Sequence, residues 1–182
     1  MISLDVFEAI QSRRSVRAYD SRPIPHDILI KILESARLAP SAINYQPWHF
    51  IVVTDENKRE ILSQARYAKF LREAPIVIIG CGDYKKSPKW YMMDTTIAMQ
   101  NMVLTATNEG LGSCWIGSFH EDRVMELLKI PDNLKVVALL ALGYPRKKFD
   151  ILAKLGGTHR RKELESIVSY EEFGKRFSSG SD

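Results

Sequence analysis

The sequence has few of the residues that build metal centres or covalent cross-links. Its 182 residues include two cysteines, Cys81 and Cys114, which lie far apart in apolar stretches. Two cysteines cannot form a disulfide framework, and neither has the CxxC or Cys/His spacing of a zinc site. The four histidines are isolated from one another along the chain. We therefore expect neither a disulfide-stabilised fold nor a metal site.

Long hydrophobic runs are missing as well. No apolar run approaches the roughly 20 residues that a membrane-spanning helix needs, and the first ten residues lack the basic-then-apolar layout of a signal peptide. These absences predict a soluble, cytoplasmic protein without a membrane partner. The length suits one domain, and 45% hydrophobic residues can bury a sizeable core. Since no linker or repeat interrupts the chain, we expect a single domain over residues 1–177 and a frayed tail over residues 178–182.

Several common enzyme signatures are absent. GCGDYK and GLGSCW begin like dinucleotide-binding loops but lack the third glycine of GxGxxG. The chain also has no GxxxxGKS/T phosphate loop, no GxSxG elbow and no HExxH pair. These absences disfavour a classical Rossmann enzyme, a P-loop NTPase, a serine hydrolase and a zinc protease.

What the chain does have is focal positive charge. The formal net charge is +4, and three short runs near residues 13–17, 146–148 and 160–162 hold nine of the 26 basic residues. The remainder holds 17 basic against 22 acidic residues. Such clusters indicate a discrete anionic ligand, because nucleic-acid binders more often spread positive charge over a face or stripe. We therefore expect no nucleic-acid partner, with a basic binding module as the alternative.

Apolar runs alternate with segments of helical periodicity. We predict strands at 49–54, 75–82, 112–117 and 135–143, and helices at about 4–12 (with Ser3 as N-cap), 26–38, 55–66, 90–108 and 121–130. This alternation predicts an α/β or α+β sheet domain. The helix at 90–108 is apolar on nearly all sides, so it must be buried in a domain centre or between subunits. A weak final helix is expected near the C-terminus.

The first candidate site is RRSVRAY, residues 13–19, where three arginines and a serine follow a predicted helix. Arginine presents a rigid fork of donors that matches phosphate oxygens. The serine hydroxyl and local backbone N–H groups can complete the cradle. Alternatively, the arginines complement the dipole at a helix C-terminus and stay solvated. Both interpretations fit this spacing.

Two further segments carry groups suited to a flat ligand. PSAINYQPW, residues 40–48, places the amides of Asn44 and Gln46 on a loop stiffened by two prolines. In GLGSCWIG, residues 110–117, Gly117 ends a predicted strand, where bare backbone can approach a ligand closely. An ordinary turn and an ordinary strand exit are the alternatives. A late basic segment at 158–162 is a second candidate anion contact or a solvated charge run.

Taken in order, these segments resemble the nitroreductase family of flavin-dependent oxidoreductases over nearly the whole chain. The resemblance implies an α+β sandwich, with a central, mostly antiparallel sheet flanked by helices. It implies an intertwined homodimer with one FMN in each of two interface sites. NAD(P)H would deliver a hydride to the flavin, and a nitroaromatic, quinone or similar small molecule would take the electrons by a ping-pong mechanism. Flavin fragmentation, dehalogenation and azoline oxidation are alternative chemistries of this fold.

The resemblance also implies which residues hold the cofactor. Arg13, Arg14 and Ser15 match positions that bind the FMN phosphate and ribityl chain, and Arg17 matches the basic residue beside the pyrimidine edge. A fixed cation there would stabilise anionic reduced flavin. No side chain is expected to act as a general acid.

Other matches come from the partner's loop, from the third strand and from the C-terminal part. They are Pro40, Ser41, Ala42, Asn44 and Gln46 in the loop, Ile116 and Gly117 beside the flavin nitrogen N5, and Arg160 and Arg161 at the phosphate. The chain departs from the family in two places. Ile116 stands where many larger members carry glutamate, and residues 83–93 leave little room for the helical excursion that shapes their substrate pocket.

Overall fold

The computed structural model describes residues 5–146 and 161–176. They belong to two compact units, residues 1–146 and 147–182, each of which is described by itself. The single domain expected over residues 1–177 stays a prediction. The site residues up to Gly117 all lie in the first unit.

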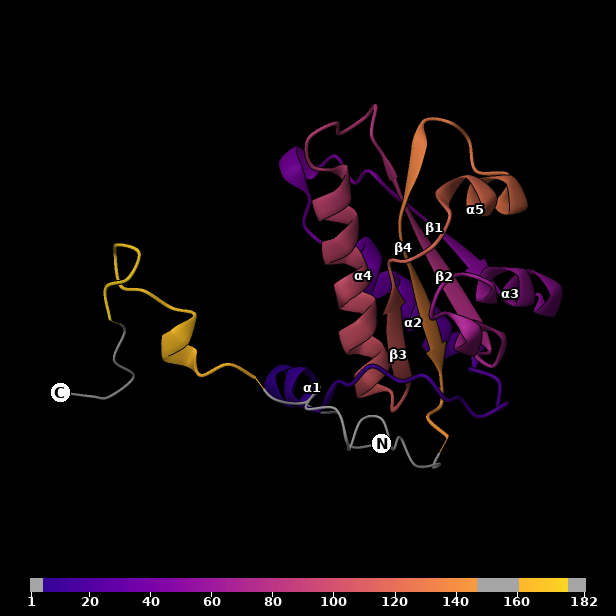
Figure 1. Ribbon diagram of the computed structural model, residues 1–182, viewed down its shortest axis with the longest axis horizontal. Coiled ribbons are helices and arrows are strands. Elements are labelled where there is room, and N and C mark those ends of the chain that lie inside the picture. Colours follow the sequence, from indigo (N-terminus) through magenta and orange to yellow (C-terminus); the bar gives the residue numbers. More distant parts are fainter. Residues whose placement is uncertain (1–4, 147–160, 177–182) are drawn as a thin grey trace. The chain divides into compact units, whose positions relative to one another are not determined.

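A four-stranded antiparallel sheet forms the centre of the first unit (Figure 1). Its spatial order is β1 (Trp48–Val53), β2 (Ile76–Asp83), β4 (Leu134–Gly143) and β3 (Gly112–Ile116). β2 and β4 occupy the middle and are buried almost throughout. Burial on both faces explains why their sequences read as continuous apolar runs instead of alternating ones.

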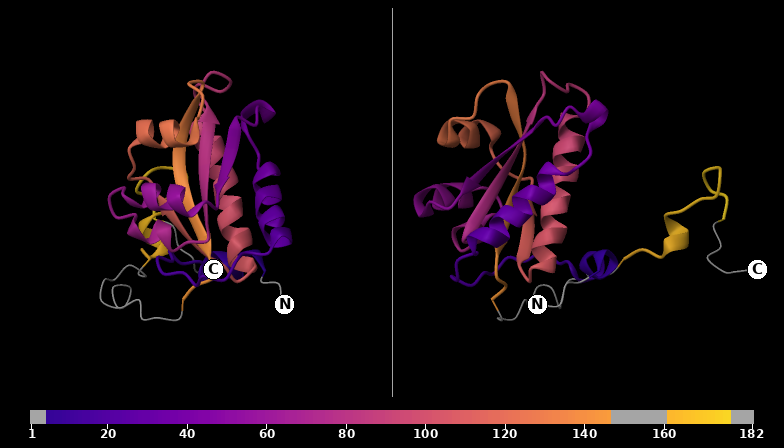
Figure 2. Two further views of the ribbon diagram at one scale, coloured as in Figure 1. Left: turned by 90° about the vertical axis from the view of Figure 1, so that its right-hand side faces the viewer. Right: turned by 180° about the vertical axis from the view of Figure 1, so that it is seen from behind.

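Helices cover both faces of this sheet, as Figures 1 and 2 show. α2 (His26–Arg37) and α4 (Tyr91–Asn108) pack on one face, where Ile32, Met99 and Met102 are fully buried. α3 (Glu56–Ser63) and α5 (Glu121–Leu128) lie on the other face with the 3-10 helix η2 (Lys69–Arg72). The expected sandwich with a central, antiparallel sheet is therefore confirmed.

Several helix ends differ from the sequence-based prediction by one to three residues, and those of α1 and α3 have clear local features. α1 spans Val6–Ser12 and is capped by Asp5, not by Ser3. The Asp5 carboxylate accepts a bond of 2.7 Å from the backbone N–H of Glu8, and Glu8 returns one of 3.0 Å. This reciprocal capping box satisfies two N–H groups that helix geometry leaves free. α3 begins after Asp55 as expected but ends at Ser63, three residues early.

The outer side of α4 is less covered than its sequence predicts. Its inner side, including Ala98 and Met99, is fully buried, whereas Met92, Met93 and Ile97 are 56%, 54% and 37% exposed. The described part of one chain therefore covers only part of this apolar helix, which leaves the subunit-interface interpretation in place.

The second unit is small in its described part. Residues 161–176 hold a 3-10 helix η3 (Leu164–Ser166) and a bridge between Ser169 and Arg176. The weak final helix is therefore wrong for residues 171–176, which form bends and turns.

Candidate functional site

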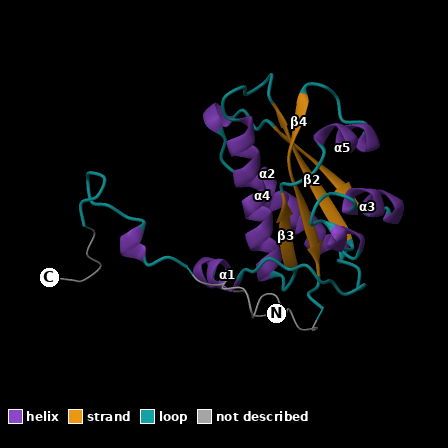
Figure 3. Ribbon diagram, viewed as in Figure 1, coloured by secondary structure: helices purple, strands orange, loops and turns teal. Residues whose placement is uncertain are grey.

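The segment that follows α1 is fixed along the edge strand β3. Ser15 forms a parallel bridge with Ser113, and the Val16 N–H donates to the Ser113 carbonyl at 2.9 Å. Gly112 allows this approach, because a Cβ atom there would lie 2.5 Å from Cγ2 of Val16. In Figure 3 the loop then crosses below β3 and β4. The arginine-rich segment is therefore held against the sheet.

Tyr19 anchors the far end of this loop. Its side chain is 2% exposed, and its hydroxyl donates to the Val16 carbonyl at 2.5 Å. Burial and the neighbouring Cys114 raise the pKa of Tyr19, while Arg17 acts in the opposite direction. A second bridge pairs Tyr19 with Pro145 at the end of β4. The positions between Ser15 and Tyr19 are thus fixed at both ends.

The three arginines of this segment have different surroundings. Arg14 is exposed, and its Nη1 donates to the carbonyls of Gln11 at 2.5 Å and Arg13 at 2.8 Å. In this structure Arg14 therefore closes the C-terminus of α1, as the alternative interpretation of the cluster expects. Burial raises the pKa of the Cys114 thiol, and the charges of Arg17 and Arg13 lower it. Arg13 and Arg17 lie on either side of Ser15 and Val16, which are the residues paired with Ser113 of β3.

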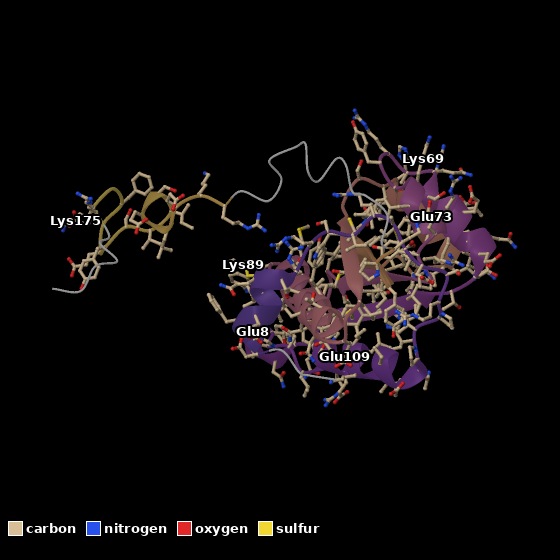
Figure 4. All side chains as sticks on the ribbon, turned by 90° about the horizontal axis from the view of Figure 1, so that it is seen from below. Glu8, Lys69, Glu73, Lys89, Glu109 and Lys175 are labelled. Atoms are coloured by element: carbon tan, nitrogen blue, oxygen red, sulfur yellow. The ribbon has the colours of Figure 1, made fainter. Side chains whose placement is uncertain are left out.

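Arg17 also borders a basic cavity that sequence reasoning missed. The cavity measures about 570 Å³ and is lined by residues between the end of α3 and the end of η2. Its cations are Arg17, Arg66, Lys69 and Arg72, and its carboxylate is Glu73. Figure 4 shows Lys69 and Glu73 beside each other at the margin of the first unit. The basic segment RYAKFLR, residues 66–72, was visible in the sequence. Its position in the same cavity as Arg17 was not predicted, because about 50 residues separate the two segments along the chain.

The loop between α2 and β1 is strained and internally bonded. The 3-10 helix η1 (Ala42–Asn44) lies within it, and Ile43, Asn44 and Gln46 have φ angles of 50°, 57° and 47°. The left-handed region is costly for a β-branched residue such as Ile43. Ser41 Oγ accepts from the Gln46 N–H at 2.9 Å, and the Gln46 amide donates to Asn44 Oδ1 at 2.9 Å. The amides of the predicted motif are therefore held in one arrangement.

Asp94 ties this loop to the start of α4. Its side chain is 3% exposed, and both carboxylate oxygens lie 3.3 Å from the Ala42 backbone N–H. The contact spans 52 sequence positions, so no local pattern indicates it. The arginine-rich segment lies instead near the C-terminal end of α4, just before β3. At 1.5 Å per residue, Asp94 and the end of α4 are about 20 Å apart. One chain therefore does not bring the loop and the arginines together.

Comparison of the sequence with known proteins identifies the family to which the chain belongs. The sequence profile of the Nitroreductase family matches residues 10–77 and 62–144. A protein of Methanothermobacter thermautotrophicus, provisionally named NADH dehydrogenase/NAD(P)H nitroreductase, is 40% identical over 149 residues, which are 78% of this chain and 78% of that protein. The chain belongs to the nitroreductase family.

Solved structures agree with the assignment to the nitroreductase family. An FMN-dependent nitroreductase from Clostridium difficile R20291 has a TM-score of 0.76 and 31% identity, over 91% of this chain and 98% of that one. The NADPH:FMN oxidoreductase of Vibrio harveyi, solved with NAD⁺, has a TM-score of 0.82 and 25% identity, over 94% of this chain and 79% of that one.

In this member of the nitroreductase family the exit of β3 offers backbone instead of a polar side chain. Ile116 is 5% exposed and packs in the apolar core on the α3–α5 face. Gly117 is exposed, and apart from its two chain neighbours no described residue has an atom within 4 Å of where its Cβ would be. An approaching planar group would therefore meet the backbone at this position.

The last two predicted residues can be described only in part. Arg160 lies outside the described residues, and Arg161 is an exposed residue of the second unit. Their place at a phosphate therefore stays a prediction.

The two cysteines are buried and free. Burial raises the pKa of the Cys81 thiol to about 11, so it is protonated at neutral pH.

Residues 5–146 and 161–176 contain no cluster of three His, Cys, Asp or Glu side chains suited to a metal ion. None of the helices described in those ranges has both the length and the apolar character that a bilayer crossing requires.

Proposed function

We propose that this nitroreductase-family chain is an FMN-dependent oxidoreductase that uses NAD(P)H to reduce nitroaromatics, quinones or similar small molecules. The observation that carries the proposal is the fixed edge of β3. Arg13, Ser15 and Arg17 are held at its start, and the open backbone of Gly117 lies at its exit. The FMN-dependent and NAD⁺-bound relatives support the same cofactor and donor.

The residues present fit a phosphorylated flavin. Arg13 and Ser15 would hold its phosphate, because a guanidinium and a hydroxyl supply charge-assisted and neutral hydrogen bonds. Arg14 would join them by leaving the carbonyls of α1. Arg17 would face the pyrimidine edge, where a cation favours the anionic reduced form. When bound, FMN supplies hydride acceptance from NAD(P)H and delivery of electrons to the acceptor in alternate half-reactions.

A homodimer is part of this proposal. Pro40, Ser41, Ala42, Asn44 and Gln46 lie at the opposite end of α4 from the arginines, so a second copy would have to present this loop to the flavin. The exposed methionines and Ile97 of α4 offer an apolar surface for that second copy. NAD(P)H as donor suits a cytoplasmic location.

The purified protein tests the proposal directly. We expect a yellow protein whose visible absorbance is bleached by NADH or NADPH under anaerobic conditions and restored by a nitroaromatic or quinone. Product analysis after aerobic turnover distinguishes this activity from flavin fragmentation, dehalogenation and azoline oxidation. A colourless protein that takes up no added FMN would overturn the proposal.

A further inference from the structure

The short connection between β2 and α4, residues 84–90, is fastened to the strained loop between α2 and β1. Directly before this β2–α4 segment, the Asp83 N–H donates to the Pro47 carbonyl at 2.7 Å. Shortly after it, both carboxylate oxygens of Asp94 lie 3.3 Å from the Ala42 N–H. Figure 1 shows the segment and the loop at the same end of α4, where this helix begins. The segment therefore moves with the loop as one block.

Hydrogen bonds also fix the backbone of the β2–α4 segment. The Asp83 carboxylate accepts bonds from the backbone N–H groups of Lys85 at 3.0 Å and Lys86 at 2.9 Å. The Trp90 N–H donates to the Ser87 carbonyl at 3.2 Å. The exposed side chains at the end of the segment therefore project from an ordered turn.

The segment ends with a cation and an aromatic ring. Nζ of Lys89 lies 4.7 Å from the centre of the Trp90 ring, which is 38% exposed, and Figure 4 shows Lys89 at the margin of the first unit. Across residues 5–146 and 161–176, Lys89 forms no ion pair with a carboxylate. The sequence YKKSPKW of residues 84–90 holds three lysines and no acidic residue. The pair therefore suits a ligand that is both flat and anionic.

The position of Trp90 connects this pair to the proposed dimer surface. Trp90 directly precedes α4, and Met93 and Ile97 follow it at spacings of three and seven residues, on the same side of the helix. All three side chains are exposed. If a second copy presents its loop to the flavin, the β2–α4 segment of that copy comes with the loop. Lys89 and Trp90 then border the flavin site from the second copy.

We propose that Lys89 and Trp90 are specificity residues that favour anionic aromatic acceptors over neutral ones. Trp90 packs against the flat ring of the acceptor, and the Lys89 ammonium pairs with a carboxylate or sulfonate on that ring. Neither residue takes part in the transfer of hydride or electrons. The inference rests on the proposed function, because it names the class of acceptor that the oxidoreductase uses.

Binding of two unreactive ligands to the FMN-loaded protein tests the pair without turnover. 2-Naphthoate and 2-naphthamide share the flat ring and differ in charge. By calorimetry we expect the naphthoate to bind about threefold to fivefold more tightly, which is the worth of one exposed ion pair. The difference should shrink as ionic strength rises. Equal affinities for the two ligands would overturn the inference.

Variants then assign the selectivity to the β2–α4 segment. We expect Lys89→Gln to abolish the preference for the naphthoate, and to lower the ratio of kcat/KM for 4-nitrobenzoate over 4-nitrobenzamide by about threefold to fivefold. Trp90→Leu should weaken both ligands by a similar factor, because it removes the ring and leaves the charge. The matched control is Lys58→Gln, an exposed lysine of α3 outside the segment. It should leave the preference and the ratio unchanged.

The flavin spectrum separates this inference from the proposed function. A yellow protein that NAD(P)H bleaches, but whose preference for the naphthoate survives Lys89→Gln, would overturn the role of Lys89 and leave the oxidoreductase standing. Loss of FMN from Lys89→Gln would assign this lysine to the cofactor and would also overturn its role at the acceptor. Absence of any flavin uptake by the unmodified chain would defeat the proposed function itself, and the inference with it.

Discussion

Gly112 and Gly117 flank the ends of β3, and the structure constrains them differently. A Cβ atom at Gly112 would lie 2.5 Å from Val16, inside the closest approach that side chains tolerate, whereas Gly117 has open space around it. Gly112 therefore serves the fold, because it lets the arginine-rich segment lie on the sheet. Gly117 is free to serve a ligand.

Alanine at each position should separate these roles. We expect Gly112→Ala to lower the free energy of unfolding by about 1–3 kcal/mol, the cost of overpacking a filled site. We expect Gly117→Ala to stay within about 0.5 kcal/mol of the unmodified chain while weakening FMN binding. Chemical denaturation and flavin titration measure the two effects. Equal stability losses in both variants would contradict this assignment.

At the scale of elements, α4 connects the two halves of the proposed site. Its inner side packs on the sheet, its start holds Asp94 against the strained loop, and its end leads into β3. Its outer side carries the exposed Met92, Met93 and Ile97. The same helix therefore spaces the loop away from the arginines of its own chain and offers a surface to a second copy.

A charge on this surface should break the proposed dimer. Burying an isoleucine side chain is worth about 1.5–3 kcal/mol, so we expect Ile97→Asp to weaken dimerisation on the order of 100-fold. FMN retention should fall with it, because the loop would come from the lost partner. Sedimentation velocity and the flavin spectrum measure both effects.

Ile61→Asp is the matched control for this helix. Ile61 is 46% exposed on α3, across the sheet from α4. We expect it to leave dimerisation unchanged. A dimer that survives Ile97→Asp with its flavin intact would place the interface elsewhere.

At the scale of the whole molecule, the sequence predicted individual helices and strands better than it predicted contacts between residues that are distant along the chain. Asp55 and the periodic Ile28, Ile32 and Ala36 mark helices locally, and the run at residues 76–83 marks a buried strand, so each was predictable. The contact of Asp94 with Ala42 and the joining of Arg17 to residues 66–72 depend on long-range packing. No local period encodes them, and this is why the basic cavity was missed while the arginine motif was found.

FMN binding should raise the melting temperature of the folded protein. A ligand at 100 times its Kd stabilises the folded state by about 2.7 kcal/mol, and each kcal/mol shifts the Tm of a chain of this size by about 2–4 °C. We therefore expect FMN to raise Tm by about 5–10 °C. Riboflavin should raise it less, because it lacks the phosphate that Arg13 and Ser15 would hold. Differential scanning calorimetry measures both shifts.

The variant Arg13→Ala tests whether this guanidinium binds the phosphate of FMN. Without the guanidinium, the extra stabilisation by FMN over riboflavin should shrink, because the phosphate loses a charge-assisted hydrogen bond worth about 1.5–3 kcal/mol. Arg123→Ala removes an exposed guanidinium from α5 and should leave the difference intact. If FMN and riboflavin stabilise the unmodified chain equally, the arginine-rich segment does not bind the phosphate, and its attachment to β3 serves the fold alone.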